Sequence, residues 1–241
     1  MSKRSDILVV VPVHNEALSI GAVLADLRTH AAGCDVLVVN DGSTDATPDV
    51  ARATGVPVLD LCFNIGIGGA VQAGFKYAIE RDYKIVVQLD GDGQHLAEEI
   101  APLIEPVRAG RCEMAIGSRF ANGTADYEGS AVRRLATRVL SGVCGALTGQ
   151  RITDATSGFR AYGPRALSYL ATYYPADYPE PEAIVLLARR NFPICEVPVR
   201  MRVRQGGQSS IRGPRTVYYM TKVMLALLIA AVKEGPARQI T

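Results

Sequence analysis

Two aspartates one residue apart, Asp90 and Asp92, have the type and spacing of a divalent-cation site. They follow the apolar run 85–89, which is typical of a strand buried on both faces. Mg²⁺ and Mn²⁺ prefer oxygen ligands and are often held by one or two carboxylates together with substrate phosphates. Gly91 permits the turn that brings both carboxylates to one side. An ordinary Asp-Gly turn is the alternative, but the position after a buried strand favours a site for a metal ion and a diphosphate.

Two further carboxylates, Asp41 and Glu16, come shortly after other apolar runs. At the end of a buried strand, either could accept a hydrogen bond from a nucleoside. Each also has a structural explanation. The segment after Asp41 offers Ser43 or Asp45 as the cap of a following helix, and Glu16 could favour the first turn of its own helix through the helix dipole. Binding by Asp41 and capping by Asp45 are compatible.

Arginines in the second half of the chain suit phosphate groups, which they can bind with two parallel hydrogen bonds. Arg119 follows a short apolar run, and Arg202 and Arg204 stand beside the Gly- and Ser-rich segment 206–210. From residue 196 onward there are eight Lys and Arg against two Asp and Glu, whereas the rest of the chain has 18 against 22. A solvated basic surface is the alternative for any single arginine, but we favour phosphate binding for Arg119 and Arg204.

Two other motifs are less specific. The glycine-rich segment 64–70 resembles a phosphate cradle but is neither a G-x-G-x-x-G nor a Walker sequence, which argues against a dinucleotide oxidoreductase. Close backbone packing explains it equally well. Glu180 and Glu182 precede an apolar helix, so helix-dipole effects account for them, and a role as catalytic base is the weaker interpretation.

The composition indicates one well-packed domain. The chain has 241 residues, of which 48% are hydrophobic and 21% charged, and this excludes a disordered, collagen-like or coiled-coil protein. The five cysteines lie far apart with no C-x-x-C pair, so we expect neither a disulfide framework nor a cysteine zinc site, and a reducing cytoplasm is the default. The net charge of +2 by itself implies no partner.

The elements that must position these side chains alternate between strands and helices. Apolar runs predict strands at 7–13, 36–39, 56–61 and 85–89, followed by 114–117 and 193–199. Helical spacing predicts a helix starting near Asn15 and further helices around 70–78, 100–107, 131–147 and 183–190. This alternation is typical of a doubly wound α/β domain, which binds ligands at the carboxyl ends of its strands.

The segment 216–232 is apolar, and Lys222 is its one charged residue. Its longest uninterrupted apolar stretch, 223–232, is much shorter than the roughly 20 residues that a membrane-spanning helix needs. With arginines before it, it suits a helix lying in the membrane interface, and a core or dimer helix is the alternative.

Taken together, the motifs resemble the family-2 glycosyltransferases of GT-A fold, in particular the polyprenyl or dolichyl phosphate mannose synthase type. They cover about 200 residues in the family's order. The segments that carry the resemblance are VVVPVHNE (9–16), VVNDGSTD (38–45), NIGIGGA (64–70), QLDGDGQH (88–95), IGSRF (116–120), DATSGFRA (154–161) and EVPVRMRVRQGGQSSI (196–211). Departures include His14 and Ser210, where many members have Tyr and Lys.

The resemblance implies a Rossmann-like nucleotide-diphospho-sugar transferase domain over residues 1–212, with a mostly parallel sheet, and a membrane-associated helix over 213–241. It also implies roles for particular residues. The nucleotide sugar would be bound by Pro12, His14, Glu16, Asp41, Asp90, Gly91 and Asp92. The metal, Mg²⁺ or Mn²⁺, would be held by Asp90, Asp92 and Gln94. The acceptor phosphate would be bound by Arg119, Arg133, Arg202, Arg204 and Ser209, and the catalytic residues would be Asp92, Arg119 and Arg204.

The expected reaction is inverting transfer of a sugar from a GDP- or UDP-sugar to a polyprenyl phosphate on the cytoplasmic face of a membrane. Alternatives are a soluble glycosyltransferase with a hydroxyl acceptor, which would need a base such as Glu180 or Glu182, and a catalytically silent sugar-nucleotide-binding partner. We expect no nucleic-acid partner, and a homo-oligomer or a membrane-protein partner stays open.

Overall fold

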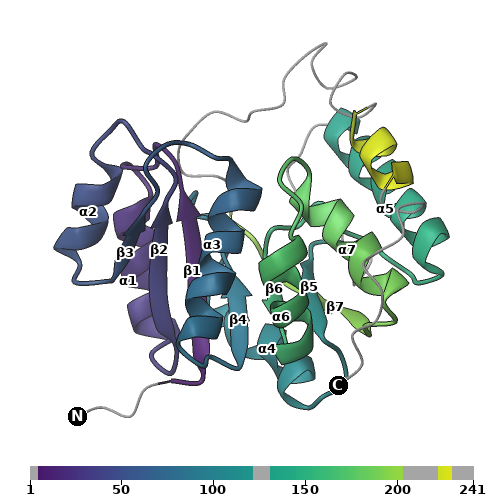
Figure 1. The fold of residues 1–241 in the computed structure, drawn as a ribbon, viewed down its shortest axis with the longest axis horizontal. Helices are drawn as coiled ribbons and strands as arrows, with labels where there is room; N and C mark the ends of the chain where they lie inside the picture. Colours follow the sequence, from purple (N-terminus) through teal and green to yellow (C-terminus); the bar gives the residue numbers. More distant parts are fainter. Residues whose placement is uncertain (1–4, 122–130, 203–221, 230–241) are drawn as a thin grey trace.

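Seven strands form one sheet in the order β3-β2-β1-β4-β6-β5-β7 in a computed structural model that describes residues 5–121, 131–202 and 222–229 (Figure 1). β6 runs antiparallel to its neighbours β4 and β5, and the other pairs are parallel. The mostly parallel α/β fold is therefore confirmed. The strands are β1 Ile7–Val13, β2 Asp35–Asn40, β3 Val58–Asp60, β4 Ile85–Gln88, β5 Met114–Ser118, β6 Arg160–Tyr162 and β7 Ile194–Pro198.

Helices cover both faces of the sheet. One apolar core receives side chains from α3, α5, α6 and α7, and the other receives side chains from α1, α2 and α4. Their bounds are α1 Ile20–His30, α2 Thr47–Ala53, α3 Ile67–Glu80, α4 Ile100–Arg108, α5 Ala131–Thr148, α6 Pro164–Tyr173 and α7 Pro179–Arg189. A single 3₁₀ turn, Ala97–Glu99, precedes α4.

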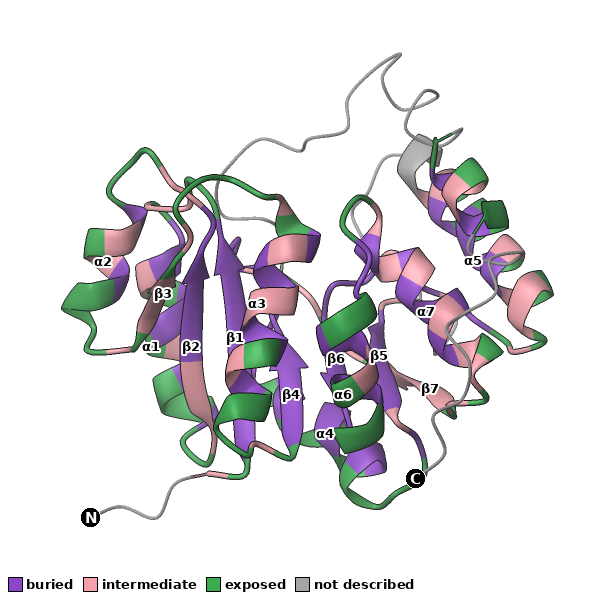
Figure 2. Cartoon of the chain, in the orientation of Figure 1, coloured by how far each residue is buried: buried purple, intermediate pink, exposed green. Residues whose placement is uncertain are grey.

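The central strand β1 shows why the apolar runs are continuous. Leu8 and Val10 point into the core under α3, whereas Val9 and Val11 point into the core under α1. All four side chains are fully buried, as Figure 2 shows for the strand as a whole. A strand covered on both faces needs apolar residues at every position, because successive side chains point to opposite faces.

The first helix begins later than expected. We expected a start near Asn15, but α1 begins at Ile20. Asn15 has a left-handed backbone conformation with φ 55°, and its side-chain oxygen accepts a hydrogen bond from the backbone N–H of Thr44. Glu16 therefore precedes the helix, and its backbone carbonyl accepts the N–H groups of Ser19 and Ile20. The interpretation that Glu16 favours the first turn of α1 is wrong.

Two elements were not predicted from the sequence, and the third strand is much shorter than expected. The strand β6 has three residues, one of them Arg160, and so carries no apolar run that would predict it. The helix α6 begins at Pro164, directly after it. The third strand was expected over 56–61 but spans Val58–Asp60, after Pro57, which has no backbone N–H to donate.

The C-terminal helix is described in part. Residues 222–229 are helical, and Val223 and Leu227 are buried in the core shared with α5 and α7. Within the described ranges, no helix is long and apolar enough to cross a membrane. The expected domain boundary at 212/213, together with Arg204 and Ser209, lies outside the described residues, so the division into 1–212 and 213–241 stays a prediction.

Candidate active site

The sheet brings the predicted binding residues to one edge. β1 pairs with β2 on one side and with β4 on the other, all three parallel, so the segments after them meet at their carboxyl ends. The backbone N–H of Asp41 donates to the carbonyl of Val13. The hydroxyl of Ser19 donates to the carbonyl of Gly91 at 2.7 Å. Three loops, from 14–19, 41–46 and 89–95, are therefore joined directly by hydrogen bonds.

Asp90 and Asp92 follow β4, as predicted, and differ in exposure. The Asp90 side chain is 35% exposed, and its Oδ2 lies 3.2 Å from Nε2 of His95. Asp92 is 8% exposed, and its Oδ1 accepts the backbone N–H of Gln94 at 3.0 Å. The Asp90 carboxylate is thus partly exposed to solvent, while the Asp92 carboxylate is held by a hydrogen bond within its own loop.

Two glycines make room for these carboxylates. A Cβ placed on Gly158, in the loop before β6, would lie 2.7 Å from Oδ2 of Asp90. A Cβ on Gly91 would lie 2.6 Å from a methyl group of Val13 in β1. Any larger residue at either position would push the aspartate loop or its neighbour aside. The glycine in DATSGFRA therefore has a steric role beside the first aspartate.

The donor set fits a hard divalent cation that substrate phosphates help to hold. In the described part of the chain, no group of three or more His, Cys, Asp and Glu side chains is placed to hold a metal ion. A pair of carboxylates is the usual protein contribution where phosphate oxygens and waters complete the shell of Mg²⁺. Asp90, open on one side and flanked by Gly158, leaves space for such a shell.

His95 contacts Asp90 and is itself packed against an aromatic ring. Its ring stacks on Phe159, with 5.0 Å between ring centroids. Its Nε2 contacts the Asp90 carboxylate, and its Nδ1 is buried without a hydrogen-bond partner in the described structure. The loop that carries His95 is also hydrogen-bonded to the start of the basic segment. His95 forms an isolated β-bridge with Met201, and the N–H of Arg202 donates to the carbonyl of Gln94 at 2.8 Å.

Asp41 anchors the glycine-rich turn. Its two carboxylate oxygens accept the backbone N–H groups of Ile65 and Gly66, at 2.8 and 2.9 Å. Gly66 has φ 87°, which favours glycine. Nδ1 of His14 lies 2.8 Å from the Asp41 carbonyl, so Nδ1 carries the proton of this contact, since a carbonyl can only accept. Asp41 thus has a structural task at the edge where a nucleoside role is predicted.

The glycine-rich turn is also closely packed. A Cβ on Gly68 would lie 2.2 Å from the carbonyl oxygen of Pro175, and a Cβ on Gly69 would lie 2.6 Å from the side chain of Ile65.

Asp45, one of the two predicted caps, accepts the first backbone N–H of α2, from Thr47, at 2.9 Å. The carboxylate of Glu16 accepts the hydroxyl of Ser19 at 3.0 Å.

Arg119 forms a buried ion pair that the sequence did not predict. Its Nε and Nη2 donate to the two oxygens of Asp154 at 2.6 and 2.7 Å, and Nη2 also reaches the hydroxyl of Thr156 at 3.0 Å. The side chains of Arg119 and Asp154 are 8% and 0% exposed. Glu196 of β7 fixes this loop by accepting the N–H of Asp154 at 2.9 Å. The phosphate-binding role of Arg119 stays a prediction.

The other arginines predicted to bind phosphate are either more exposed than Arg119 or have side chains outside the described residues. Arg202 is 45% exposed, and its Nη1 lies 3.5 Å from Oδ2 of Asp26 in α1. Arg200, its neighbour along the chain, pairs with Glu98 and Glu99. The side chain of Arg133 is outside the described residues.

The strand β6 contains a buried arginine that the sequence did not predict. Arg160 of β6 is 0% exposed, and its guanidinium donates to the backbone carbonyls of Ser157, Glu180 and Ala155 at 2.8, 2.7 and 3.0 Å. Beside it, Oε1 of Gln88 accepts the hydroxyls of two tyrosines, Tyr162 and Tyr174. The sequence offered little signal for it, because the residues around Arg160 form no apolar run. Its role is to hold the amino end of α7 against the sheet.

Glu180, in the first turn of α7, belongs to the same region as the aspartates. Burial raises the pKa of its carboxyl group to about 7. The positive charge of Arg160 opposes this shift, and the negative charge of Asp90 adds to it. The interaction with Asp90 brings Glu180 to the candidate site, in addition to its place in the dipole field of α7.

We expect Glu180 to make the stability of the metal-free protein depend on pH. The folded state holds a proton that the unfolded state, with a pKa near 4.5, has released, so the unfolding free energy should fall as the pH rises from 4.5 to about 7. Glu180→Gln should flatten this decline and make the protein more stable than the parent at pH 8. Urea denaturation in chelator at pH 5 and 8 measures both. Glu80→Gln on α3 is the control, and an unchanged slope in Glu180→Gln would contradict the assignment.

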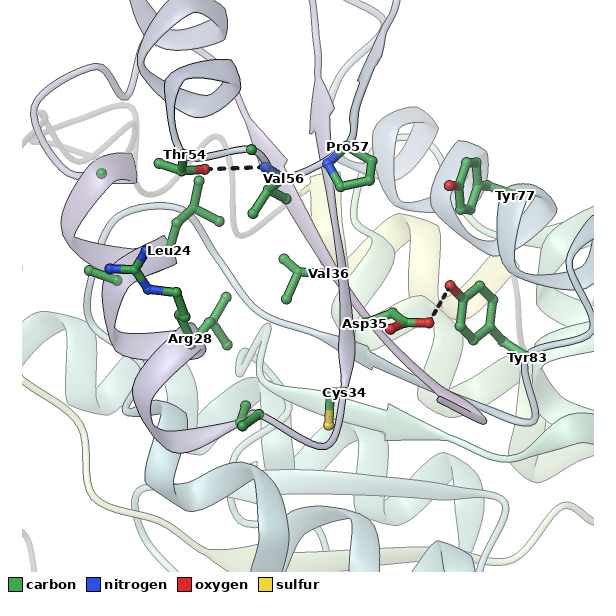
Figure 3. Close-up of a pocket in the computed structure, with 16 residues that line it drawn as sticks. Leu24, Arg28, Cys34, Asp35, Val36, Thr54, Val56, Pro57, Tyr77 and Tyr83 are labelled. Carbon is green, nitrogen blue, oxygen red and sulfur yellow. Dashed lines mark hydrogen bonds between the residues drawn. The ribbon is translucent and has the colours of Figure 1, made fainter. Parts of the chain in front are cut away.

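A separate pocket lies at the opposite edge of the sheet. It has a volume of about 610 Å³ and is lined by Leu24 and Arg28 of α1, by Asp35 and Val36 at the start of β2, and by Tyr77 among others (Figure 3). The hydroxyl of Tyr83 donates to Asp35 there at 2.9 Å. None of the predicted site residues line it, so the aspartate edge remains the candidate active site.

Comparison with known proteins identifies the family of the chain. Residues 8–170 match the family Glycosyl transferase family 2. The chain is 33% identical over 215 residues to an undecaprenyl-phosphate mannosyltransferase of Micrococcus luteus, covering 86% of this chain and 88% of the relative. It is 30% identical to a polyprenol monophosphomannose synthase of Mycolicibacterium smegmatis, covering 90% and 84%. A glucosyl-3-phosphoglycerate synthase from Mycobacterium tuberculosis, crystallised with Mn²⁺, UDP and phosphoglyceric acid, shares the fold with TM-score 0.70 at 22% identity, covering 98% and 81%.

The protein is thus a glycosyltransferase with the GT-A fold. It belongs to glycosyltransferase family 2, and within that family it is similar to the polyprenyl-phosphate sugar synthases.

Proposed function

We propose that this protein transfers a sugar, with inversion, from a nucleoside diphosphate sugar to a polyprenyl phosphate at the cytoplasmic surface of a membrane. The observation that carries the proposal is the pair Asp90 and Asp92 at the end of β4, one open and one fixed, on the edge shared with Asp41. The relatives named above act on undecaprenyl and polyprenol phosphates, which supports this acceptor class.

The donor would lie across the loops after β1, β2 and β4. Asp90, Asp92 and Gln94 would hold Mg²⁺ or Mn²⁺, which neutralises charge on the leaving diphosphate when bound. Support for this metal comes from the two-carboxylate donor set, and the Mycobacterium tuberculosis enzyme of the same fold was crystallised with Mn²⁺ and UDP. The nucleoside would contact the loop residues Pro12, His14, Glu16 and Asp41.

The acceptor would approach from the arginine side of the site. Arg119 is held at the end of β5 by Asp154, and Arg133, Arg202, Arg204 and Ser209 are the further candidates for its phosphate. A phosphate is already anionic at neutral pH, so its oxygen can attack the anomeric carbon without a strong base. The protein's task is then to orient two anionic groups that would otherwise repel each other.

A hydroxyl acceptor is the second candidate, and one observation favours it. Glu180 stands near Asp90 with a pKa of about 7, the value expected of a base that works near neutral pH. A hydroxyl needs such a base, whereas a phosphate does not. The two candidates therefore differ in which acceptor the protein can use.

We expect the purified protein to transfer sugar only when a divalent cation is present. The assay supplies labelled GDP- and UDP-sugars with polyprenyl phosphate or polyprenol, in Mg²⁺, Mn²⁺ or EDTA. Transfer to polyprenyl phosphate that EDTA removes supports the proposal. Transfer that persists in EDTA contradicts the metal assignment, and transfer to polyprenol but not to its phosphate supports the hydroxyl alternative.

A further inference from the structure

Two of the cysteines, far apart in the sequence, lie in contact at the β5–β7 edge of the sheet. The thiols of Cys112 and Cys195 are hydrogen-bonded to each other. Cys112 comes just before β5 and is 3% exposed, whereas Cys195 lies in β7 beside Ala115 of β5 and is half-buried. Both side chains pack in the apolar core that includes α4, and both are free thiols. Two thiols in contact need only a small movement to form a disulfide.

The two thiols differ in a way that assigns each a part in such a reaction. The hydrogen bond from Cys112 and the positive charge of Arg111 lower the pKa of the Cys195 thiol, although burial opposes this shift. The same hydrogen bond, together with burial, raises the pKa of the Cys112 thiol. The thiolate is the reactive form, so Cys195, which is also the more exposed of the two, should react first. A reactive cysteine beside a second thiol is the arrangement of a redox-sensitive pair.

A buried cysteine elsewhere shows that this arrangement is specific. The thiol of Cys144 in α5 lies 3.9 Å from the carbonyl oxygen of Pro181, and burial raises its pKa to about 11. Such a thiol stays protonated and packs as a small apolar side chain. Burial alone therefore does not make a cysteine of this protein reactive.

The strand β7 connects the cysteine pair to the loop that holds Arg119. Glu196 follows Cys195, and its carboxylate accepts the backbone N–H groups of Thr153 and Asp154, both at 2.9 Å. Asp154 in turn forms the buried ion pair with Arg119. Consecutive residues of a strand point to opposite faces, so a shift of the backbone at Cys195 also moves the carboxylate of Glu196. A bond made on one face of β7 therefore acts on the loop at the other.

We propose that Cys112 and Cys195 form a reversible disulfide on reaction with hydrogen peroxide, and that this bond loosens the loop that holds Arg119. The Cys195 thiolate attacks one peroxide oxygen, the O–O bond breaks, and the departing hydroxide takes up a proton as water. Cys112 then attacks the sulfur of the resulting sulfenic acid, so that the S–S bond forms and the S–O bond breaks with loss of a second water. Two thiols thus lose two electrons and two protons to the peroxide, and a thiol reductant restores them.

Peptide mass spectrometry tests the disulfide directly. The full chain is reduced, freed of reductant, treated with an equimolar amount of hydrogen peroxide and alkylated. The parent should yield a peptide pair linked through Cys112 and Cys195, which dithiothreitol separates. Cys195→Ala should form no such link, and Cys112→Ala should retain a sulfenic acid on Cys195 that dimedone traps. Cys62→Ser, which removes an exposed cysteine, is the matched control and should form the link as the parent does.

Amide hydrogen exchange tests the effect on the loop. In the oxidised parent, the N–H groups of Thr153 and Asp154 should exchange roughly tenfold faster or more, because their hydrogen bonds to Glu196 open more often. Peroxide should leave exchange at these positions unchanged in Cys195→Ala, and circular dichroism shows that this variant is folded. We also expect oxidation to lower sugar transfer severalfold and dithiothreitol to restore it. This last effect rests on the proposed function, because it depends on Arg119.

The outcomes separate this inference from the proposed function. A parent that forms no Cys112–Cys195 link, or whose loop exchanges at the same rate once the link has formed, overturns the proposal. Both of those measurements are made on the parent and hold even if a variant fails to fold. A linked parent with a faster-exchanging loop that transfers no sugar in either state supports the proposal and contradicts the function. Unchanged transfer in a linked, loosened protein would support the proposal and contradict the role of Arg119.

Discussion

Replacing Asp92 with asparagine is expected to lower sugar transfer by about 10²- to 10³-fold, an effect of the size seen when an enzyme loses a group that stabilises developing charge. Asparagine retains an oxygen that can accept the backbone N–H of Gln94, so the loop should keep its shape. Only the negative charge is lost, so the proposed divalent cation should bind more weakly. The measurements are the transfer rate and Mn²⁺ binding followed by electron paramagnetic resonance.

A matched control removes a carboxylate elsewhere. Asp49 lies on α2, and its side chain is 83% exposed, so Asp49→Asn should leave both transfer and Mn²⁺ binding unchanged. Thermal unfolding of the metal-free proteins shows whether Asp92→Asn is folded. Full activity in a folded Asp92→Asn protein would contradict the assignment of this loop to a metal ion. Loss of activity with unchanged Mn²⁺ binding would contradict it as well.

Arg119→Met is expected to lower the unfolding free energy by about 3–5 kcal/mol, the cost of breaking a buried ion pair. The substitution leaves the Asp154 carboxylate, which is 0% exposed, without its cation. Hydrogen bonds from the hydroxyl of Thr156 and the backbone N–H of Arg119 offset a part of this cost. Urea denaturation measures the change.

A double variant separates the structural role of Arg119 from its predicted role in binding phosphate. In Arg119→Met/Asp154→Asn the buried charge is gone from both partners, so much of the lost stability should return. Transfer to polyprenyl phosphate should stay low, because the cation predicted to bind the acceptor phosphate is still missing. If transfer recovers together with stability, Arg119 acts only through folding and the phosphate assignment is wrong.

The sequence was most informative where chemistry and local structure coincide. The apolar runs predicted β1 with its observed bounds and β4 within one residue, because strands buried on both faces leave a continuous apolar pattern. The carboxylates that follow these strands could be assigned to one edge, because parallel strands end together. Local rules were less accurate at α2, where Ala46 is the N-cap and Asp45, one residue earlier, accepts the N–H of Thr47.

Contacts between residues far apart in the sequence could not be predicted from such local patterns. Asp154 lies 35 residues from Arg119 in the chain. The sequence is equally compatible with a buried pair of these two side chains and with both of them exposed to water. The interaction of Glu180 with Asp90 and the hydrogen bond from Arg160 to the Glu180 carbonyl likewise join distant segments, and Arg160 lies in a strand too short and too polar to be predicted. These relations arise from packing, which brings charges together that chain spacing does not relate.

The amino-acid sequence alone was therefore enough to predict the α/β architecture, the family and the position of the two aspartates after a buried strand. Each of these predictions is built from residue patterns that extend over about ten positions of the chain. The tertiary structure decided which charges pair inside the protein and which side chains face outward: Arg119 pairs with Asp154 in the interior, and the apolar side of α5 is exposed. The physical reason is that burial and electrostatic interactions depend on distance in space, and only the folded chain sets those distances.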